Sequence, residues 1–191
     1  DPLAQALAEL ARQFPRHCPP PGTADDTAPI PGGTGAIVQS LDMLRELVAD
    51  PWLMGRVAAN HALSDLFASG ARPVSALAAI SLPYAGPEIL QRELQQLLAG
   101  ALHEMARVDC LLAGGRSMQG PELSIGFAVN GVAMASDGRW LHKRGLAVGD
   151  KLVLTKPLGT GVLFAAHMQL RADGRDIATA IDSMLASNGP A

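Results

Sequence analysis

The chain has 191 residues, of which 48% are hydrophobic, and its formal net charge at pH 7 is −3. This length and apolar content suffice for one full domain with a hydrophobic core and part of a second domain. The 15 Lys and Arg residues are scattered and form no basic stripe, so we expect no nucleic acid partner.

Hydrophobic periodicity and turn residues predict the secondary structure. The longest apolar run, over 74–83, is much too short to span a bilayer, so no membrane partner is expected. Asp50 and Pro51 suit the N-cap and the first position of a helix. In chain order we expect a helix over 3–14, a strand over 36–41, a helix over 50–69, a strand over 74–82, a helix from Pro87, strands over 110–113, 123–135 and 151–155, and helices over 162–170 and 176–186.

The order of these elements indicates an α+β fold in two parts. We assign residues 1–138 to one domain and residues 139–191 to the beginning of another. The second part, with roughly fifty residues, is too short for a core of its own. We therefore expect the chain to be a fragment of a longer protein.

Carboxylates mark three places in the chain. Asp25 and Asp26 lie in a loop rich in Pro and Gly, Asp42 ends the first predicted strand, and Asp65 lies in the helix that follows. Such acids can be solvated surface, or they can hold Mg²⁺, which proteins commonly bind through one or two carboxylates plus phosphate oxygens. Because no run of Lys or Arg accompanies them, we favour a metal and nucleotide site. A cap or turn role for Asp42 remains open beside a role in a ligand crevice.

Three further features fit a phosphate site, and each has a plainer alternative. His61 and Asp65 are four residues apart and share a helix face, which equally suits a local hydrogen bond. The glycines 114–115 follow a predicted strand and allow close backbone approach to phosphate, or they form an ordinary tight turn. Lys156 lies in a loop without P-loop spacing and is either a phosphate ligand or an exposed lysine.

No set of side chains indicates a catalytic nucleophile. Ser117 has no His at a recognisable spacing, and His17 and Cys18 are sequence neighbours, whose side chains rarely point at each other. Cys110 is the second of the two cysteines. Two cysteines make neither a disulfide framework nor a metal-ligand pattern, so we expect reduced thiols in a cytoplasmic protein.

Taken in order, a series of motifs resembles the selenophosphate synthetases (selenide, water dikinases) of the aminoimidazole-ribonucleotide-synthetase-like superfamily. The match runs over roughly residues 23–191, and the last motif separates this family from thiamine-monophosphate kinases and hydrogenase-maturation relatives. The motifs are Asp-Asp-Thr-Ala (25–28), Gln-Ser-Leu-Asp (39–42), Asp-Pro with Gly-Arg-Val-Ala-Ala (50–59), Ala-Leu-Ser-Asp-Leu-Phe-Ala (62–68), Gly-Ala-Arg-Pro (70–73), Leu-Ala-Gly-Gly-Arg-Ser (112–117), Gly-Phe-Ala-Val-Asn-Gly (126–131) and Thr-Lys-Pro-Leu-Gly-Thr-Gly (155–161).

The resemblance implies an N-terminal α+β domain over 1–138 that binds ATP and dimerises through its sheet, followed by a C-terminal α/β domain. It implies ATP and Mg²⁺ as cofactors and selenide as the small-molecule substrate, with selenophosphate, phosphate and AMP as products. It also implies the site residues. The metal aspartates of the family correspond to Asp26 and Asp65, the acid beside the phosphates to Asp42, and the glycine turn that contacts nucleotide to Gly114, Gly115 and Ser117.

The chain also departs from the family. Nothing before Asp25 matches the glycine-rich loop that carries Cys or selenocysteine and Lys, so the catalytic residue is unknown. Arg116 stands where the family has His, and His61 stands where it has Asn, with Asn60 one place earlier. The third metal aspartate of the family falls past Ala191. The amino-acid sequence of residues 60–65 is most similar to family members that are fused behind a flavin-dependent disulfide-oxidoreductase-like domain.

Two functions follow from these observations. The first is ATP-dependent phosphorylation of selenide, with this chain as the N-terminal portion of the enzyme and inactive alone. The second is a catalytically silent nucleotide-binding or dimerisation module attached to a redox domain. In either case we expect a homodimer. For the first we also expect Asp26 and Asp65 to lie close together across a cleft, with Asp42 nearby.

Overall fold

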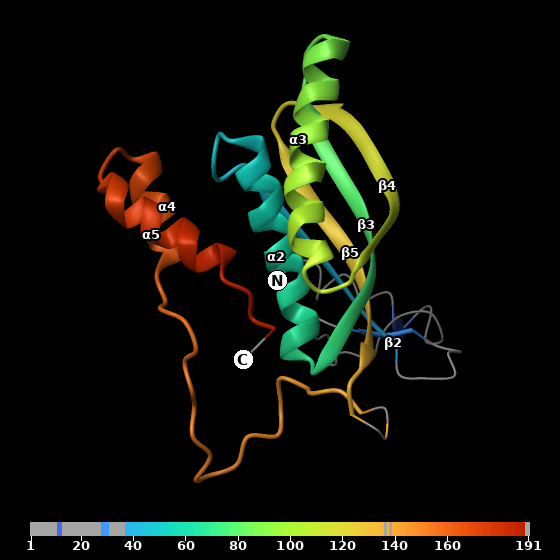
Figure 1. Cartoon of the computed structure of the whole chain (residues 1–191). Helices are drawn as coiled ribbons and strands as arrows, with labels where there is room; N and C mark the ends of the chain where they lie inside the picture. The colour runs from blue at the N-terminus through green and yellow to red at the C-terminus, as the bar shows by residue number, and fades with distance from the viewer. Residues whose placement is uncertain (1–10, 13–27, 31–36, 136, 138, 190–191) are drawn as a thin grey trace.

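A computed structural model of the chain describes residues 11–12, 28–30, 37–135, 137 and 139–189 (Figure 1). The expected helix over 3–14 and the Asp25–Asp26 loop therefore lie wholly or almost wholly outside the described residues. The described elements are β1 (Ala28–Pro29), β2 (Ile37–Arg45), α2 (Pro51–Ala68), β3 (Ala71–Pro83), α3 (Pro87–Ala106), β4 (Leu111–Gly120), β5 (Ser124–Ala133), α4 (Thr160–Met168) and α5 (Gly174–Leu185).

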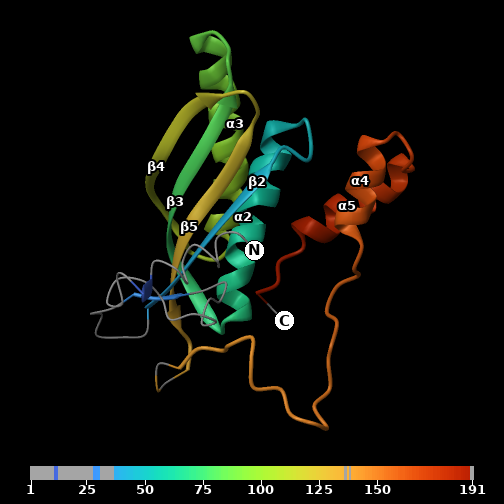
Figure 2. The same ribbon diagram turned by 180° about the vertical axis from the view of Figure 1, so that it is seen from behind.

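The described strands form one mixed sheet in the order β1-β2-β5-β3-β4. The pairs β1–β2, β2–β5 and β3–β5 are antiparallel, and β3–β4 is parallel with α3 as the crossover. Helices α2 and α3 lie on one face of the sheet, and α4 and α5 lie beside α2 (Figures 1 and 2). The α+β fold predicted from the sequence is confirmed.

Helix α2 is the central element of the core, and its sequence specifies both of its ends. The Asp50 side chain accepts a hydrogen bond from the backbone N–H of Leu53, and Pro51 takes the first helical position, where a missing N–H costs nothing. The helix ends at Ser69, and Gly70 follows with a φ of 67°, which glycine adopts without strain. The apolar face of α2 packs on the sheet through Met54, Leu63 and other buried residues.

Helices α2 and α3 approach each other closely through glycines. Gly55 of α2 lies against the backbone of Leu97, and Gly100 of α3 lies against the backbone of Trp52. Beside this contact the buried carboxylate of Glu104 accepts hydrogen bonds from Arg56 at 2.6 Å and from Arg107 at 3.0 Å. The guanidinium groups compensate the buried negative charge and so hold α3 to α2.

Two expected strand ends and one expected strand were wrong. Strand β2 continues to Arg45, so Asp42 lies inside the strand instead of ending it. Strand β4 continues to Gly120, so the 114–115 glycines lie within a strand and not in a turn. Residues 151–155 have no regular secondary structure in place of the expected strand, because no described segment pairs with them.

Local pairing explains the two longer strands. The backbone of β2 pairs with β5 without interruption through Asp42 to Arg45, so a charged residue does not terminate the strand. In β4 the pairing with β3 shifts register at Ala76 and Leu77, which is a bulge, and Gly115 then lies so close to β3 that a Cβ would be 2.2 Å from the carbonyl oxygen of Ala78. Only glycine fits this approach, and glycine inside a strand commonly marks such a site.

The sheet face opposite α2 and α3 is apolar and exposed. No described helix covers it, and Figure 2 looks onto it. Leu41 is 65% exposed on β2 and Leu77 is 47% exposed on β3. Both residues pair with Ala128 of β5, so they lie in one row across the face. A sheet with apolar side chains on both faces normally has cover on both.

Candidate functional site

Two polar pairs connect β2 to α2. The hydroxyl of Ser40 donates a hydrogen bond of 2.8 Å to Oδ2 of Asp65, and Oδ2 of Asp42 lies 3.7 Å from Nε2 of His61. Two residues along a strand advance by about 6.7 Å, and four residues along a helix advance by about 6 Å. Because β2 and α2 run in opposite directions, these spacings match, and the two pairs follow each other like rungs between strand and helix. Asp42 and Asp65 therefore lie on one ridge, the line along which β2 contacts α2.

The second rung combines an acid with a titratable base at the surface. Asp42 is 29% exposed and His61 is 48% exposed. At 3.7 Å the contact is too long for a hydrogen bond and becomes an ion pair when the imidazole is protonated. The sequence also allowed a hydrogen bond between His61 and Asp65. In the structure Asp65 instead accepts a hydrogen bond from Ser40, and His61 lies near Asp42.

A cavity of about 400 Å³ opens beside these rungs. One wall comes from α2 and carries His61 and Asp65. The opposite wall comes from the segment around α4 and α5 and carries Lys156 and Thr160. Both signs of charge therefore line the cavity, which suits a polar ligand with anionic oxygens and a cation.

Lys156 has a structural role in this conformation. Its Nζ donates hydrogen bonds to the carbonyl oxygens of Ser183, at 3.3 Å, and of Ala186, at 2.8 Å. These carbonyls lie at the C-terminal end of α5, where a cation is favourable. Partial burial lowers the pKa of Lys156 below its usual range. Lys156 is thus a helix-capping lysine here, and the sequence alternatives did not include that role.

The donor set fits a hard cation. Asp42 and Asp65 supply carboxylate oxygens and Ser40 supplies a hydroxyl, and Mg²⁺ needs one or two carboxylates when phosphate oxygens complete its shell. Within the part of the chain that the structure describes, no group of three or more His, Cys, Asp or Glu side chains converges on one metal position. Asp26 lies outside the described residues, so its proximity to Asp65 stays a prediction.

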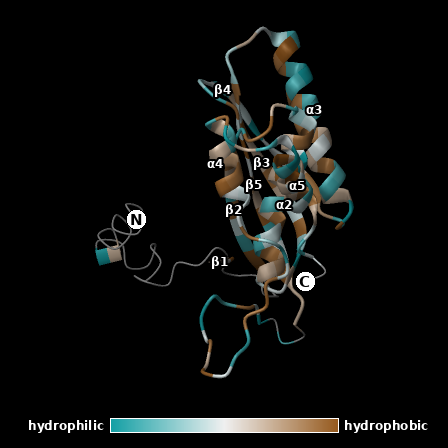
Figure 3. Cartoon of the chain, turned by 90° about the vertical axis from the view of Figure 1, so that its left-hand side faces the viewer, coloured by the Kyte–Doolittle hydropathy of each residue, from teal (hydrophilic) through white to brown (hydrophobic). Residues whose placement is uncertain are grey.

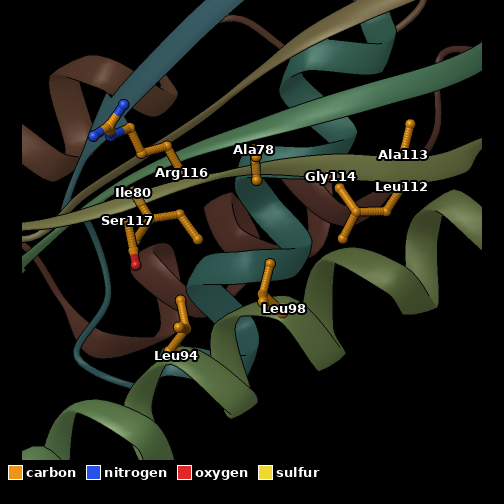
Figure 4. A pocket seen from close by; sticks show the side chains of 10 residues that line it. Ala78, Ile80, Leu94, Leu98, Leu112, Ala113, Gly114, Arg116 and Ser117 are labelled. Carbon is orange, nitrogen blue, oxygen red and sulfur yellow. The ribbon is translucent and has the colours of Figure 1, made fainter.

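The 114–115 glycines and Ser117 line a different cavity. It measures about 310 Å³ and lies between β4 and α3. Figure 4 shows the Ser117 hydroxyl and the side chains of Leu94 and Leu98 directed into the space between strand and helix, while Arg116 points away. Strands β5 and β3 separate β4 from β2. At about 4.8 Å per strand spacing, the glycines are roughly 14 Å from the β2 rungs. One chain therefore does not bring Asp42 and the glycine pair into a single pocket.

Sequence reasoning missed two residues of the site. Ser40 is two positions before Asp42, so it lies on the same strand face, and this period of two was a usable signal. Asn60 is 3% exposed, and its Nδ2 donates to the carbonyl oxygens of Met184 and Ala186. Its partners are more than 120 positions away in sequence, so no local pattern indicated them.

Cys110 belongs to neither cavity, and we expect it to be unreactive. It is 6% exposed, and burial together with neighbouring Asp109 raises the pKa of its thiol to about 11. The thiolate is the reactive form. In a Cys18→Ser variant, alkylation of Cys110 by iodoacetamide at pH 8 should be on the order of 100-fold slower in the folded chain than in urea.

The same shift predicts a pH effect on stability. The folded state keeps the thiol proton to a higher pH than the unfolded state, so stability contributed by Cys110 is lost as pH rises from 9.0 to about 11. A Cys110→Ala variant should lose this part of the alkaline decline in the free energy of unfolding. Equal alkylation rates in folded and unfolded chain would contradict both expectations.

The chain is similar to known proteins in sequence and in fold. The family model described as AIR synthase related protein, N-terminal domain, matches residues 24–133. The chain is 38% identical to the selenide, water dikinase of Geobacter metallireducens over 147 residues, which are 76% of this chain and 42% of that protein. It is 36% identical to the selenide, water dikinase of Yersinia pestis over 174 residues, which are 88% of this chain and 47% of that protein.

Solved structures share the fold at low sequence identity. The thiamine monophosphate kinase of Aquifex aeolicus aligns with a TM-score of 0.70 at 19% identity, over 94% of this chain and 58% of that one. A structure of AaThiL complexed with AMPPCP and TMP aligns with a TM-score of 0.72. The chain spans less than half the length of the curated relatives named above. Among the described residues, none of the helices has the length and apolar content needed to cross a membrane.

Proposed function

Since this chain belongs to the AIR synthase related family and carries its N-terminal domain, we propose that it is the N-terminal portion of a phosphotransferase that converts selenide, ATP and water to selenophosphate, AMP and phosphate. The selenide, water dikinases that it resembles support this substrate, because the identity of 36–38% extends over most of the chain. The observation that carries the proposal is the pair of rungs that place Asp42 and Asp65 on one ridge beside a polar cavity.

The residues of the site have distinct roles in this proposal. Asp65 would hold the cation through its carboxylate, while the Ser40 hydroxyl, which donates a hydrogen bond to Oδ2 of Asp65, orients that carboxylate. Asp42 lies one rung away, beside the phosphates, and His61 restrains it. Asp26 is proposed as a further ligand. A bound Mg²⁺ would neutralise the negative charge that develops on a transferring phosphoryl group.

The glycine pair enters the proposal through a second copy of the chain. Gly114, Gly115 and Ser117 lie roughly 14 Å from the β2 rungs of the same chain, by the strand spacing. A nucleotide that contacts both the β2–α2 acids and these β4 residues would have to span this distance within one chain or bind at a site shared between two copies. The open sheet face with Leu41 and Leu77, on the side opposite α2 and α3, is a separate surface through which two copies can associate.

We expect the chain to be a homodimer through this face. Burying Leu77 and its neighbours against a second copy removes exposed apolar surface, at about 25 cal/mol per Å². Light scattering at micromolar concentration should give the dimer mass, and Leu77→Glu should give the monomer. Leu102→Glu is the matched control, since Leu102 is 45% exposed on α3, away from the sheet face, and should leave the dimer intact. A monomeric wild type would refute the proposed dimer.

We also expect no ATP hydrolysis by the 191-residue chain alone. No segment matches the family's loop with Cys or selenocysteine and Lys, and loss of a single charge-stabilising group can cost on the order of 10²–10³ in rate. Phosphate release should therefore equal that of an Asp65→Ala control. Release well above this control would place a complete active site within the chain.

The test of the proposed function is binding of a non-hydrolysable ATP analogue, measured by calorimetry with Mg²⁺ and with EDTA. The expected result is binding that depends on Mg²⁺, because Asp65 would hold the cation and the cation would compensate the negative charge of the phosphates. Binding of equal strength in EDTA, or none at all, would leave the silent module as the better account. Selenide-dependent AMP formation by the longer protein then tests the acceptor.

A further inference from the structure

Two side chains from distant parts of the chain hold the C-terminal end of α5. Nδ2 of Asn60 donates to the carbonyl oxygens of Met184, at 2.6 Å, and of Ala186, at 3.0 Å. Lys156 donates to the carbonyls of Ser183 and Ala186. The Ala186 carbonyl therefore accepts from both side chains. The last carbonyls of a helix have no partner within the helix, so these donors satisfy groups that would otherwise need water.

We call the hydrogen bonds of Asn60 and Lys156 to the end of α5 the polar node, and the arrangement extends along α2 beyond it. Nδ2 of Asn188 donates to the Ser64 hydroxyl at 3.0 Å, one helical turn beyond Asn60. Asn60 is 3% exposed, so its amide is committed to these bonds and not shared with solvent. An unpaired amide at such a position would carry a large desolvation cost. The segment after α5 is therefore fixed to α2 by specific polar bonds.

Apolar contacts between α2 and the C-terminal helices are sparse. Helices α4 and α5 share a small cluster of buried residues around Phe164 and Ile177, and among the described residues Leu47 and Val48 pack against both this cluster and the main core. Much of the preceding segment is apolar yet exposed, with Val148 and Leu152 almost fully so. Figure 3 shows brown hydrophobic stretches along that loop. Because so little apolar surface holds α4 and α5 in place, the polar node matters for their position.

The node also borders the cavity beside the acid-bearing rungs. Lys156 and Thr160 face that cavity from the C-terminal side, opposite His61 and Asp65. Without the docked helices the rungs would lie on an open surface of α2. We infer that Asn60 and Lys156 are positioning residues that dock α4 and α5 against α2 and so form the second wall of the site. The ligand part of this inference rests on the proposed function.

Thermodynamic linkage gives the inference a measurable form. If docking completes the site, a ligand in the cavity stabilises the docked state. Loss of docking then lowers the affinity for that ligand by the same factor. If Lys156 only caps a helix, replacing it should change the hydrogen-exchange rates of the α5 amides and leave the affinity for the ligand unchanged. The two readouts therefore separate a positioning role from a purely structural one.

The experiment uses the 191-residue chain in three forms: wild type, Lys156→Met and Lys156→Arg. Lys156→Met removes both hydrogen bonds of Nζ, and losing even one bond to a charged group should make hydrogen exchange of the α5 amides at least about tenfold faster. The exchange should return to the wild-type rate in Lys156→Arg, which keeps the charged donor. Exchange in α3 should stay unchanged. Lys151→Met, at an exposed lysine in the same segment, is the matched control.

The second readout is the affinity for a non-hydrolysable ATP analogue with Mg²⁺. We expect about tenfold weaker binding in Lys156→Met and recovery in Lys156→Arg. Unchanged exchange in Lys156→Met would overturn the docking role. Faster exchange with unchanged affinity would overturn the inference that the docked helices form the second wall of the site. If the wild type binds no analogue, the proposed function and the ligand part of the inference both fail, while the exchange rates still decide the docking.

Discussion

Gly55→Ala should destabilise the folded chain by about 3 kcal/mol, at the upper end of the usual cost of overpacking. A Cβ on Gly55 would lie 1.9 Å from the carbonyl oxygen of Leu97. The obstacle is backbone, which cannot rotate away as a side chain could. Helices α2 and α3 would have to separate by more than an ångström. Chemical unfolding followed by circular dichroism measures the change.

The contact is reciprocal, which limits the ways to relieve it. A Cβ on Gly100 would lie 2.0 Å from the carbonyl oxygen of Trp52, one turn before Gly55. Separating the helices would also stretch the 2.6 Å bond between Arg56 and the buried Glu104. An uncompensated buried charge is costly, so the structure resists this movement. Gly100→Ala should therefore be as destabilising as Gly55→Ala.

Gly161→Ala is the matched control for both glycines. Gly161 also lies in a helix, α4, but a Cβ there would meet no atom within 4 Å. Alanine is favoured over glycine in a helix by about 1 kcal/mol, so this variant should be as stable as the wild type or slightly more stable. A Gly55→Ala variant with the same stability as Gly161→Ala would show that α2 and α3 are not held this closely.

The sequence predicted the helices of the core well because their signals are local. Asp50, Pro51 and Gly70 specify the ends of α2 from residues within or beside the helix. Pro87 marks the start of α3 in the same way. Local capping bonds decide such boundaries, and their residue preferences are strong. The packing of α2 on α3 was not predicted, because no local signal tells which glycine faces a neighbouring helix.

The strand boundaries failed where a distant partner decides the structure. Asp42 was expected to end β2, yet the backbone pairing with β5 continues through Asp42 to Arg45. Gly114 and Gly115 were expected to form a turn, but the bulge opposite Ala76 and Leu77 accommodates them in β4. Residues 151–155 have the apolar character of a strand and no described neighbour to pair with. Strand formation depends on a partner, which sequence patterns do not supply.

The site residues stay a prediction, and the structure shows only how they are arranged. Asp42 and Asp65 were identified as acids of one site, and the structure places them on adjacent rungs. The glycine pair was assigned to the same site on resemblance, and the structure places it in another cavity of the chain. Strand order, which separates β4 from β2, depends on long-range pairing. No spacing along the chain reveals it.

Asp65→Asn should reduce the Mg²⁺-dependent affinity for a non-hydrolysable ATP analogue by on the order of 10²-fold, because a carboxylate ligand becomes a neutral amide. The fold should survive the change. The amide oxygen of asparagine can still accept the bond from Ser40, so the rung remains. Unfolding measurements should therefore show nearly wild-type stability, and the loss of affinity can be attributed to the site.

Two further variants separate the roles on the ridge. Ser40→Ala leaves the Asp65 carboxylate in place but removes the hydroxyl that orients it, and loss of such a supporting partner typically costs 10–100-fold in metal affinity, so a smaller loss than in Asp65→Asn is expected. Asp109→Asn removes an equal charge from the loop between α3 and β4, at a φ of 54° that asparagine tolerates, and should leave binding unchanged. If Asp65→Asn behaved like Asp109→Asn, the carboxylate would not hold the cation. The chain would then be better described as a silent module in which the β2–α2 rungs only brace the fold.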